Sequence, residues 1–262
     1  MANRVLDRIP VLVPEDLLLL EKIVWARRGR VVEEPLEGAE AELLLVPGKR
    51  SIITVSSGIK NRQRKRFSMA HELGHMEMHR EEIKLNICTR QDIADTGRIV
   101  PHNLEQEANQ FASYFLMPTR FVKDHYQDVT RSMDAIRKVA QTFDVSLTAA
   151  ALRFIDFISE PVAIVFSRAG RIEWFKPTQD FLDTEVFVNI GEAVGSETTA
   201  GRMFRGLGAP DRWQEVKPSS WFKKRGFRDD AMVKEWSINM MNYESVLSIL
   251  WIDDDIYEDD YL

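Results

Sequence analysis

The residue types with the clearest chemical potential lie in the stretch FSMAHELGHMEMH, Phe67 to His79. His71 and His75 are four residues apart, and Glu72 follows His71 directly, which gives the pattern H-E-x-x-H. On a helix, side chains four residues apart project from one face, so both imidazoles could bind the same metal ion. Glu72 then lies on the neighbouring edge of that face, where its carboxylate could serve as the general base in metal-assisted hydrolysis.

A catalytic zinc site needs a third protein ligand from another element, with one coordination position left open for water. The segment LEQEANQFA, starting at residue 104, offers two glutamates on an expected helix. Glu105 lies toward the Ala112 side of its apolar stripe, and Asn109, one turn later, could hydrogen-bond a ligand or the backbone. Glu107 lies toward the opposite edge, near Phe111. Helical geometry and spacing favour Glu105 as the ligand, with Glu107 as the alternative.

Other polar residues near the pattern have weaker claims to the metal. His79 lies a full turn beyond His75, so we expect it in solvent or in a supporting role rather than as a ligand. Hydrolysis also calls for a group that stabilises the oxyanion, and Tyr114, His102 and His125 are all candidates. The alternative is that both glutamates are surface residues and that the two histidines contribute only to packing.

Two helices must position these side chains. The stretch 61–79 contains no proline and predicts the first, and 104–117 predicts the second, which Pro118 ends. The segment 84–103 between them has weak periodicity and is expected to be an irregular loop. Upstream, a helix over 14–29 and two or three strands within 30–57 are expected, and downstream, helices at 118–129 and within 131–158.

The domain organisation follows from a change in composition near residue 160. We expect a zincin-like metallopeptidase domain over 1–130, a helix-turn-helix-like segment over 131–159, and a separate α+β domain over 160–262. VAIVFSRAGRIEWF, beginning at Val162, predicts a β-hairpin with its turn at residues 168–170. The acidic tail past Trp251 is expected to be exposed and mobile. The fold class is α+β, with a small β-sheet beside the H-E-x-x-H helix.

Composition narrows the function classes. The 262 residues carry a formal net charge of -6, which argues against broad binding to nucleic-acid backbones, although NRQRKR at residues 61–66 is a local basic patch. The single cysteine, Cys88, offers no disulfide and no CxxC metal pair. No signal peptide or membrane-spanning apolar run is present, so we expect a cytoplasmic protein.

The three segments MAHELGHMEMH, EQEANQFASYFLMP and VAQTFDVSLTAAALRF together resemble the ImmA/IrrE family of metallopeptidases over roughly residues 50–158. The resemblance implies that His71, His75 and Glu105 bind zinc and that Glu72 is the base. Manganese is an alternative metal, because the ligand types alone do not exclude it. The resemblance also implies a substrate of the helix-turn-helix repressor type, commonly XRE-like, in stress responses or mobile elements. A GAF-like sensor or interaction module is the corresponding expectation for 160–262.

The remaining expectations concern substrates and competing functions. SIITVSS, residues 51–57, could be an edge strand that pairs with an extended substrate. The second helix of the helix-turn-helix-like segment carries Arg153 as its only base, so direct DNA reading is disfavoured. The sequence therefore predicts a zinc endopeptidase that acts on a protein substrate. The alternative is a non-catalytic, metal-containing regulator that binds a repressor or DNA.

Overall fold

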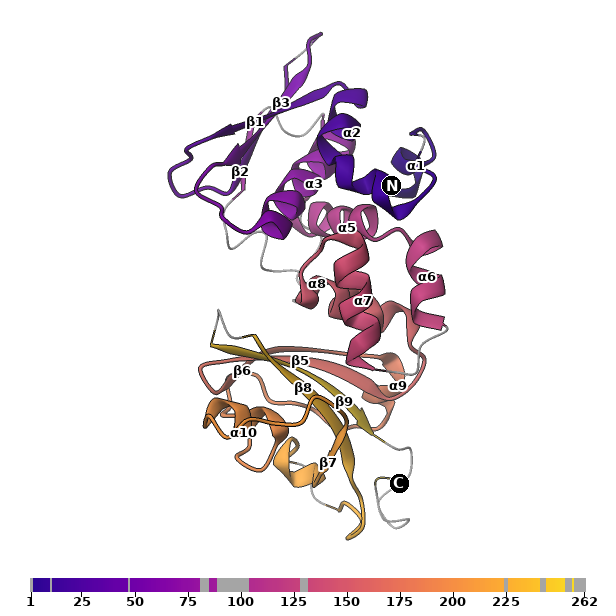
Figure 1. The fold of residues 1–262 in the computed structure, drawn as a ribbon, viewed down its shortest axis with the longest axis vertical. Coiled ribbons are helices and arrows are strands. Elements are labelled where there is room, and N and C mark those ends of the chain that lie inside the picture. Colours follow the sequence, from indigo (N-terminus) through magenta and orange to yellow (C-terminus); the bar gives the residue numbers. More distant parts are fainter. Residues whose placement is uncertain are drawn as a thin grey trace. The chain divides into compact units, whose positions relative to one another are not determined.

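The computed structural model describes residues 2–9, 11–46, 48–80, 85–88, 104–127, 132–223, 226–240, 244–252 and 256, with backbone alone for 85–88 and 124–127. The chain forms two compact units, one of Met1–Val129 with Ala135–Ala150 and one of Thr130–Asp134 with Ala151–Leu262 (Figure 1). The mixed α+β class is confirmed. The finer division into three domains stays a prediction.

In the described part of the N-terminal unit, four strands form one sheet in the order β1-β3-β2-β4. They are β1 Gly29–Glu34, β2 Ala41–Leu44, β3 Ser51–Ser56 and β4 Leu85–Cys88. β3 is parallel to β1 and antiparallel to β2, and β4 pairs with the outer side of β2. The prediction that SIITVSS is an edge strand is therefore wrong, because β3 is hydrogen-bonded on both sides.

The helices that carry the polar motifs cover this sheet. Ile53 and Val55 alternate with less buried neighbours along β3 and point into the core, as expected of a strand with one covered face. Helix α3, Arg62–Met78, packs against β2 and β3 and against α5, Leu104–Leu116. Asn61 caps α3 by accepting a hydrogen bond from the backbone N–H of Arg64 at 2.9 Å. Both predicted motif helices are confirmed.

The helix expected over 14–29 is divided in two. A 3₁₀ segment, η1, Pro14–Leu19, leads into α2, Leu20–Ala26, and the chain then enters β1 through Arg28, whose φ of 64° is left-handed. The other helices are α1 Ala2–Leu6, α6 Thr119–Gln127, α7 Met133–Phe143 and α8 Leu147–Phe154. The irregular loop expected over 84–103 lies outside the described residues, apart from β4.

A buried guanidinium ties three of these elements together. Arg66 of α3 is 5% exposed and donates hydrogen bonds of 3.2–3.3 Å to the carbonyl oxygens of Leu17, Leu18, Phe143 and Asp144. These carbonyls belong to η1 and to the end of α7. The three preceding cations of the basic patch also pair with acids, at Asp144, Glu40 and Glu33. The patch thus stabilises the fold, and because its four cations pair with three acids, its net surplus is a single positive charge.

Replacing Arg66 with Met should lower the free energy of unfolding by about 3–5 kcal/mol, because buried carbonyls and Asp144 would lose their common donor. Urea unfolding measures this change. Arg62→Met is the matched control, since the Arg62 side chain is 70% exposed and pairs with the same Asp144. It should cost less than about 1 kcal/mol. Similar losses for both variants would contradict the assigned role of Arg66.

The described part of the C-terminal unit contains a five-stranded antiparallel sheet in the order β6-β5-β9-β8-β7 (Figure 1). Its elements are η3 Ile155–Phe157, β5 Val162–Arg168, β6 Arg171–Pro177, α9 Gln179–Asp183, α10 Thr199–Phe204, β7 Gln214–Val216, η4 Pro218–Ser220, β8 Val233–Met240 and β9 Ser245–Ile252. The predicted β5–β6 hairpin is confirmed, with Ala169 and Gly170 both at positive φ in its turn.

A buried carboxylate fixes the second layer of this unit onto its sheet. Glu235 of β8 is fully buried and accepts hydrogen bonds from the backbone N–H groups of Thr199 and Ala200, at 2.9 and 2.8 Å. It also accepts from the Trp221 indole at 3.1 Å and from the Ser237 hydroxyl at 2.7 Å. The N-terminus of α10 is thereby anchored to β8, and both side-chain oxygens of Glu235 have hydrogen-bond donors within the core.

The end of the chain departs in part from expectation. Ile252 and Ile256 are buried, and Ile256 belongs to the hydrophobic core of the C-terminal unit. The tail is therefore not exposed throughout, because its two isoleucines pack into the hydrophobic core of the C-terminal unit. Residues 253–255 and 257–262 lie outside the described residues. Among the helices that are described, none has the length and apolar character required to cross a membrane.

Candidate metal centre

The close approach of α5 to α3 brings the two motif segments together. Gly74 directly precedes His75 in H-E-x-x-H, and a Cβ added there would be 3.0 Å from Cδ1 of Phe111. That distance is tighter than ordinary contacts, so with a larger residue at position 74 the Phe111 side chain would have to shift by a few tenths of an ångström. The small residue between the two histidines therefore lets α5 lie against α3 at the height of the histidine pair.

Three donor atoms converge at this contact. Nε2 of His71 lies 3.0 Å from Nε2 of His75 and 3.0 Å from Oε2 of Glu105, and Nε2 of His75 lies 3.3 Å from the same oxygen. Both histidines are fully buried, whereas the Glu105 side chain is 23% exposed. Among the described residues, this is the group of three or more His, Cys, Asp or Glu side chains whose spacing suits a metal ion.

The donor set fits a zinc-type ion. Two imidazoles and one carboxylate are the ligands of many catalytic zinc sites, and donors about 2.0–2.2 Å from one tetrahedral ion stand about 3.3 Å apart. Burial lowers the pKa of His75, which favours the neutral imidazole that a metal requires. Burial alone would raise the pKa of Glu105, but hydrogen bonds with His71 and His75 hold it well below its usual range. The carboxylate is therefore anionic at neutral pH.

Glu72 follows His71 directly in α3 and is fully buried, as are both histidines. A glutamate with no exposed surface is uncommon, because burial disfavours its charged form unless nearby groups compensate. The role of Glu72 as a general base stays a prediction from the sequence pattern.

The two glutamates of LEQEANQFA contact different histidines. Oε2 of Glu105 faces His71 and His75, whereas Oε2 of Glu107 lies 3.0 Å from Nε2 of His79. The preference for Glu105 near the histidine pair agrees with this geometry. His79 is only 2% exposed and its Nδ1 lies 2.9 Å from Nδ1 of His75, so of its two expected roles the solvent-exposed one is excluded.

Asn109 supports the other histidine. Its Oδ1 lies 2.9 Å from Nδ1 of His71, which is the hydrogen bond to a ligand that its position on α5 suggests. Of the three oxyanion candidates, His102 and the side chain of His125 lie outside the described residues, and Tyr114 is half-buried on α5. Sequence reasoning missed the pairing of His79 with Glu107. The spacing of four residues between His75 and His79 was the signal available for it.

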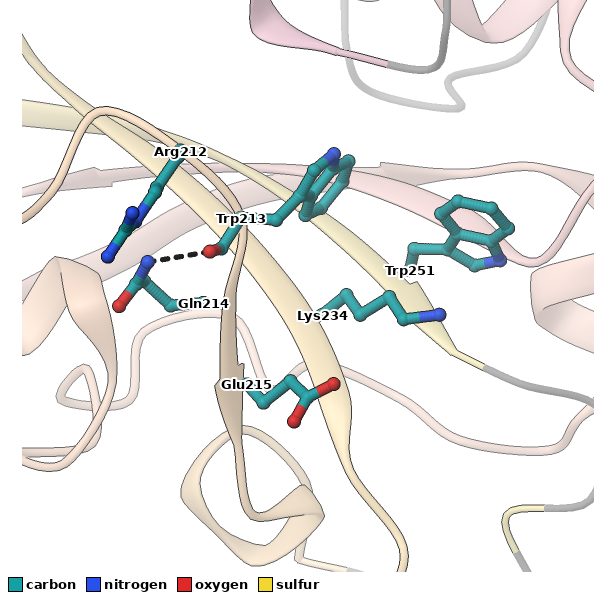
Figure 2. Close-up of a pocket in the computed structure, with 6 residues that line it drawn as sticks. All are labelled: Arg212, Trp213, Gln214, Glu215, Lys234 and Trp251. Atoms are coloured by element: carbon teal, nitrogen blue, oxygen red, sulfur yellow. Dashed lines mark hydrogen bonds between the residues drawn. The ribbon is translucent and has the colours of Figure 1, made fainter.

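The C-terminal unit has a concave surface of a different kind. A cleft of about 550 Å³ in this unit is lined by six residues, Arg212, Trp213, Gln214, Glu215, Lys234 and Trp251, whose side chains are drawn in Figure 2. The ring of Trp213 makes edge-on contacts with Trp251 and Trp236, with centroids 6.2 and 5.9 Å apart. The lining of this cleft contains one carboxylate and no histidine or cysteine. Among the described residues, the side chains spaced to bind a metal ion lie in the N-terminal unit.

The fold and the site define a mixed α+β protein with an H-E-x-x-H centre completed by a glutamate from a second helix. Residues 28–154, just under half of the chain, match the family model described as Peptidase_M78, IrrE N-terminal-like domain. The resemblance to ImmA/IrrE proteins is thereby confirmed. The matched range contains both motif helices together with α6, α7 and α8, and it ends at the last residue of α8.

Comparison with solved structures adds information on the fold alone. A Mycobacterium tuberculosis transcriptional regulator is similar to this chain with a TM-score of 0.52 and 14% identity, over 90% of this chain and 70% of that chain. The likeness therefore extends into the C-terminal unit, beyond the family match. None of the curated proteins matches the chain.

Proposed function

We propose that this protein is a zinc-dependent endopeptidase that hydrolyses a peptide bond in a protein substrate. The observation that carries the proposal is the convergence of His71, His75 and Oε2 of Glu105 within 3.3 Å of one another. These three side chains would hold the metal, and Glu72 would act as the general base. The match to a metallopeptidase family model supports the same assignment.

The reaction requires each residue to hold a proton or an orientation at a defined atom. When bound, zinc would polarise the scissile carbonyl and make a water molecule more acidic. With the metal bound, His71 and His75 would present unprotonated Nε2 atoms, and a hydrogen bond from Nδ1 of His71 to Oδ1 of Asn109 would hold His71 in that form. Glu72 accepts a proton from the attacking water and returns it to the leaving amine, which is the role that a buried carboxylate beside the donors is suited to perform.

The substrate class that we propose is a helix-turn-helix transcriptional repressor of the XRE type, in a stress response or mobile element. Its support is the family relationship of residues 28–154. An extended substrate segment would pair with an edge of the N-terminal sheet, at β1 or β4, since β3 has partners on both sides.

The competing function is a non-catalytic regulator that binds a repressor or DNA. DNA reading by α8 has little chemical support, because its one base, Arg153, is 2% exposed and forms an ion pair with Asp156. A major-groove reader needs donors on its exposed face. Manganese is an alternative to zinc, because imidazole and carboxylate ligands accept both metals.

The proposal is tested by incubating the full-length protein with a helix-turn-helix repressor encoded beside it, with and without a zinc chelator. We expect the repressor to be cleaved only by the metal-loaded protein, and its intact fraction can be followed by gel electrophoresis and mass spectrometry. Restoring zinc or manganese to the chelated protein identifies the effective metal. Cleavage that persists in chelator, or a repressor that is bound yet never cut, would refute the endopeptidase assignment.

A further inference from the structure

A series of three side chains in contact, His75, His79 and Glu107, leads away from the candidate metal centre. Nδ1 of His75 lies 2.9 Å from Nδ1 of His79, and Nε2 of His79 lies 3.0 Å from Oε2 of Glu107. Both histidines are buried and belong to α3 and its C-terminal cap, whereas Glu107 comes from α5 with its side chain 46% exposed. The series therefore runs from the site to the surface of the N-terminal unit.

The proton positions on His75 and His79 follow from the groups at the two ends of this series, which are the candidate metal centre and the carboxylate of Glu107. An imidazole that binds a metal through Nε2 must carry its proton on Nδ1, so His75 donates to Nδ1 of His79. Neutral His79 then has no proton on Nδ1 and carries one on Nε2. That proton points at Oε2 of Glu107, and a carboxylate oxygen accepts it.

The opposite arrangement is unfavourable at Glu107 and incompatible with a metal at His75. If His79 carried its proton on Nδ1, its Nε2 lone pair would face the carboxylate of Glu107 at 3.0 Å. His75 would then have to accept from His79 and carry its own proton on Nε2, the atom that faces Glu105 and His71. In that tautomer His75 cannot bind a metal through Nε2. The carboxylate of Glu107 thus selects the competent tautomer of a residue that it does not touch.

We propose that His79 and Glu107 are positioning residues, which hold His75 in the tautomer and orientation that bind the metal. The proposal rests on the assignment of His75 as a ligand in the proposed function. Neither residue contributes a ligand atom to the converging group. His71 and His75 have different partners at Nδ1. Nδ1 of His71 contacts the side-chain amide of Asn109, whereas Nδ1 of His75 contacts the imidazole of His79, which in turn contacts the carboxylate of Glu107.

The substitutions His79→Leu and His79→Asn form a nearly isosteric pair that separates positioning from packing. Asn places Oδ1 where His has Nδ1, so it retains an acceptor for His75, whereas Leu retains the shape and removes the acceptor. We expect His79→Leu to weaken zinc binding by about 10–100-fold and His79→Asn to remain within about threefold of the parent protein, as outer partners of metal-bound histidines usually behave.

Zinc affinity is measured by competition with a chromophoric chelator in the Glu72→Gln background, so that the result does not depend on catalysis. The absorption spectrum of the Co²⁺-substituted protein gives a second readout of ligand geometry. Should His79→Leu fail to fold, Glu107→Ala provides the test at a half-exposed position, and its zinc affinity is expected to be weaker than that of the parent protein.

Equal zinc affinities for His79→Leu and the parent protein, or equal losses for the Leu and Asn variants, would overturn the positioning role. Failure of the proposed function has a different signature. If the parent protein binds zinc tightly but cuts no repressor, the endopeptidase assignment fails while the comparison at position 79 still holds. If Glu105→Gln leaves zinc affinity unchanged, the ligand set itself is wrong.

Discussion

Replacing Glu72 with Gln should lower the rate of substrate cleavage by about 10²–10⁴-fold, the contribution typical of a general base. Gln has nearly the same shape but cannot accept a proton from water at neutral pH. Glu72 is fully buried in α3 and the converging donors belong to other residues, so zinc affinity should stay within a few-fold of the parent value. Single-turnover cleavage of the repressor, with zinc content measured in parallel, checks both expectations.

Glu77→Gln is the matched control for this variant. Glu77 lies on the same helix, but its carboxylate accepts hydrogen bonds from Arg27 at 2.9 and 2.7 Å, away from the donor cluster. Its loss should affect stability and leave the cleavage rate nearly unchanged. A Glu72→Gln protein that retained more than about a tenth of the parent rate would contradict the general-base role and favour the non-catalytic regulator.

Replacing Glu105 with Gln should weaken zinc binding by more than about 100-fold, beyond the 10–100-fold typical of outer partners. The substitution removes the only anionic donor of the cluster, and the pKa of Glu105 is held well below its usual range, so the ligand being lost is a full carboxylate. Cleavage should fall in parallel at limiting zinc. Isothermal titration and chelator competition measure the affinity.

Glu107→Gln distinguishes ligand loss from a general change in charge. It removes one negative charge from the same helix, two residues away, but retains an oxygen that can accept from His79. We expect a zinc affinity within about tenfold of the parent value, because Glu107 supports His79 and not the metal. A larger loss at Glu107 than at Glu105 would reverse the assignment of the third ligand.

The local features of the site could be predicted because they depend on helical periodicity. H-E-x-x-H places two imidazoles on one face wherever 61–79 is helical, and the apolar stripe of 104–117 orients Glu105 and Glu107 to different edges. Those relations involve residues at most a turn or two apart. Their geometry is therefore contained in the sequence once the helix is recognised.

The errors arose where distant segments meet. SIITVSS has the alternation of a strand with one covered face, and that pattern is the same for an edge strand and a central one. Only pairing with β1 on one side and β2 on the other made β3 central. Likewise, the segment NRQRKR is basic in the sequence, but in the structure its side chains form ion pairs with acids from distant segments. These acids are Glu33 of β1, Glu40 just before β2 and Asp144 just after α7.

The sequence by itself predicted the H-E-x-x-H pattern on a helix, the second helix that carries Glu105 and a separate C-terminal region of mixed α and β structure. Tertiary structure decided which glutamate faces the histidine pair, because that depends on how closely α5 approaches α3 over Gly74. It also decided that the imidazole of His79 contacts His75 through one ring nitrogen and Glu107 through the other. The physical reason is that helical periodicity sets the direction of a side chain, whereas the packing of separate elements sets what that side chain meets.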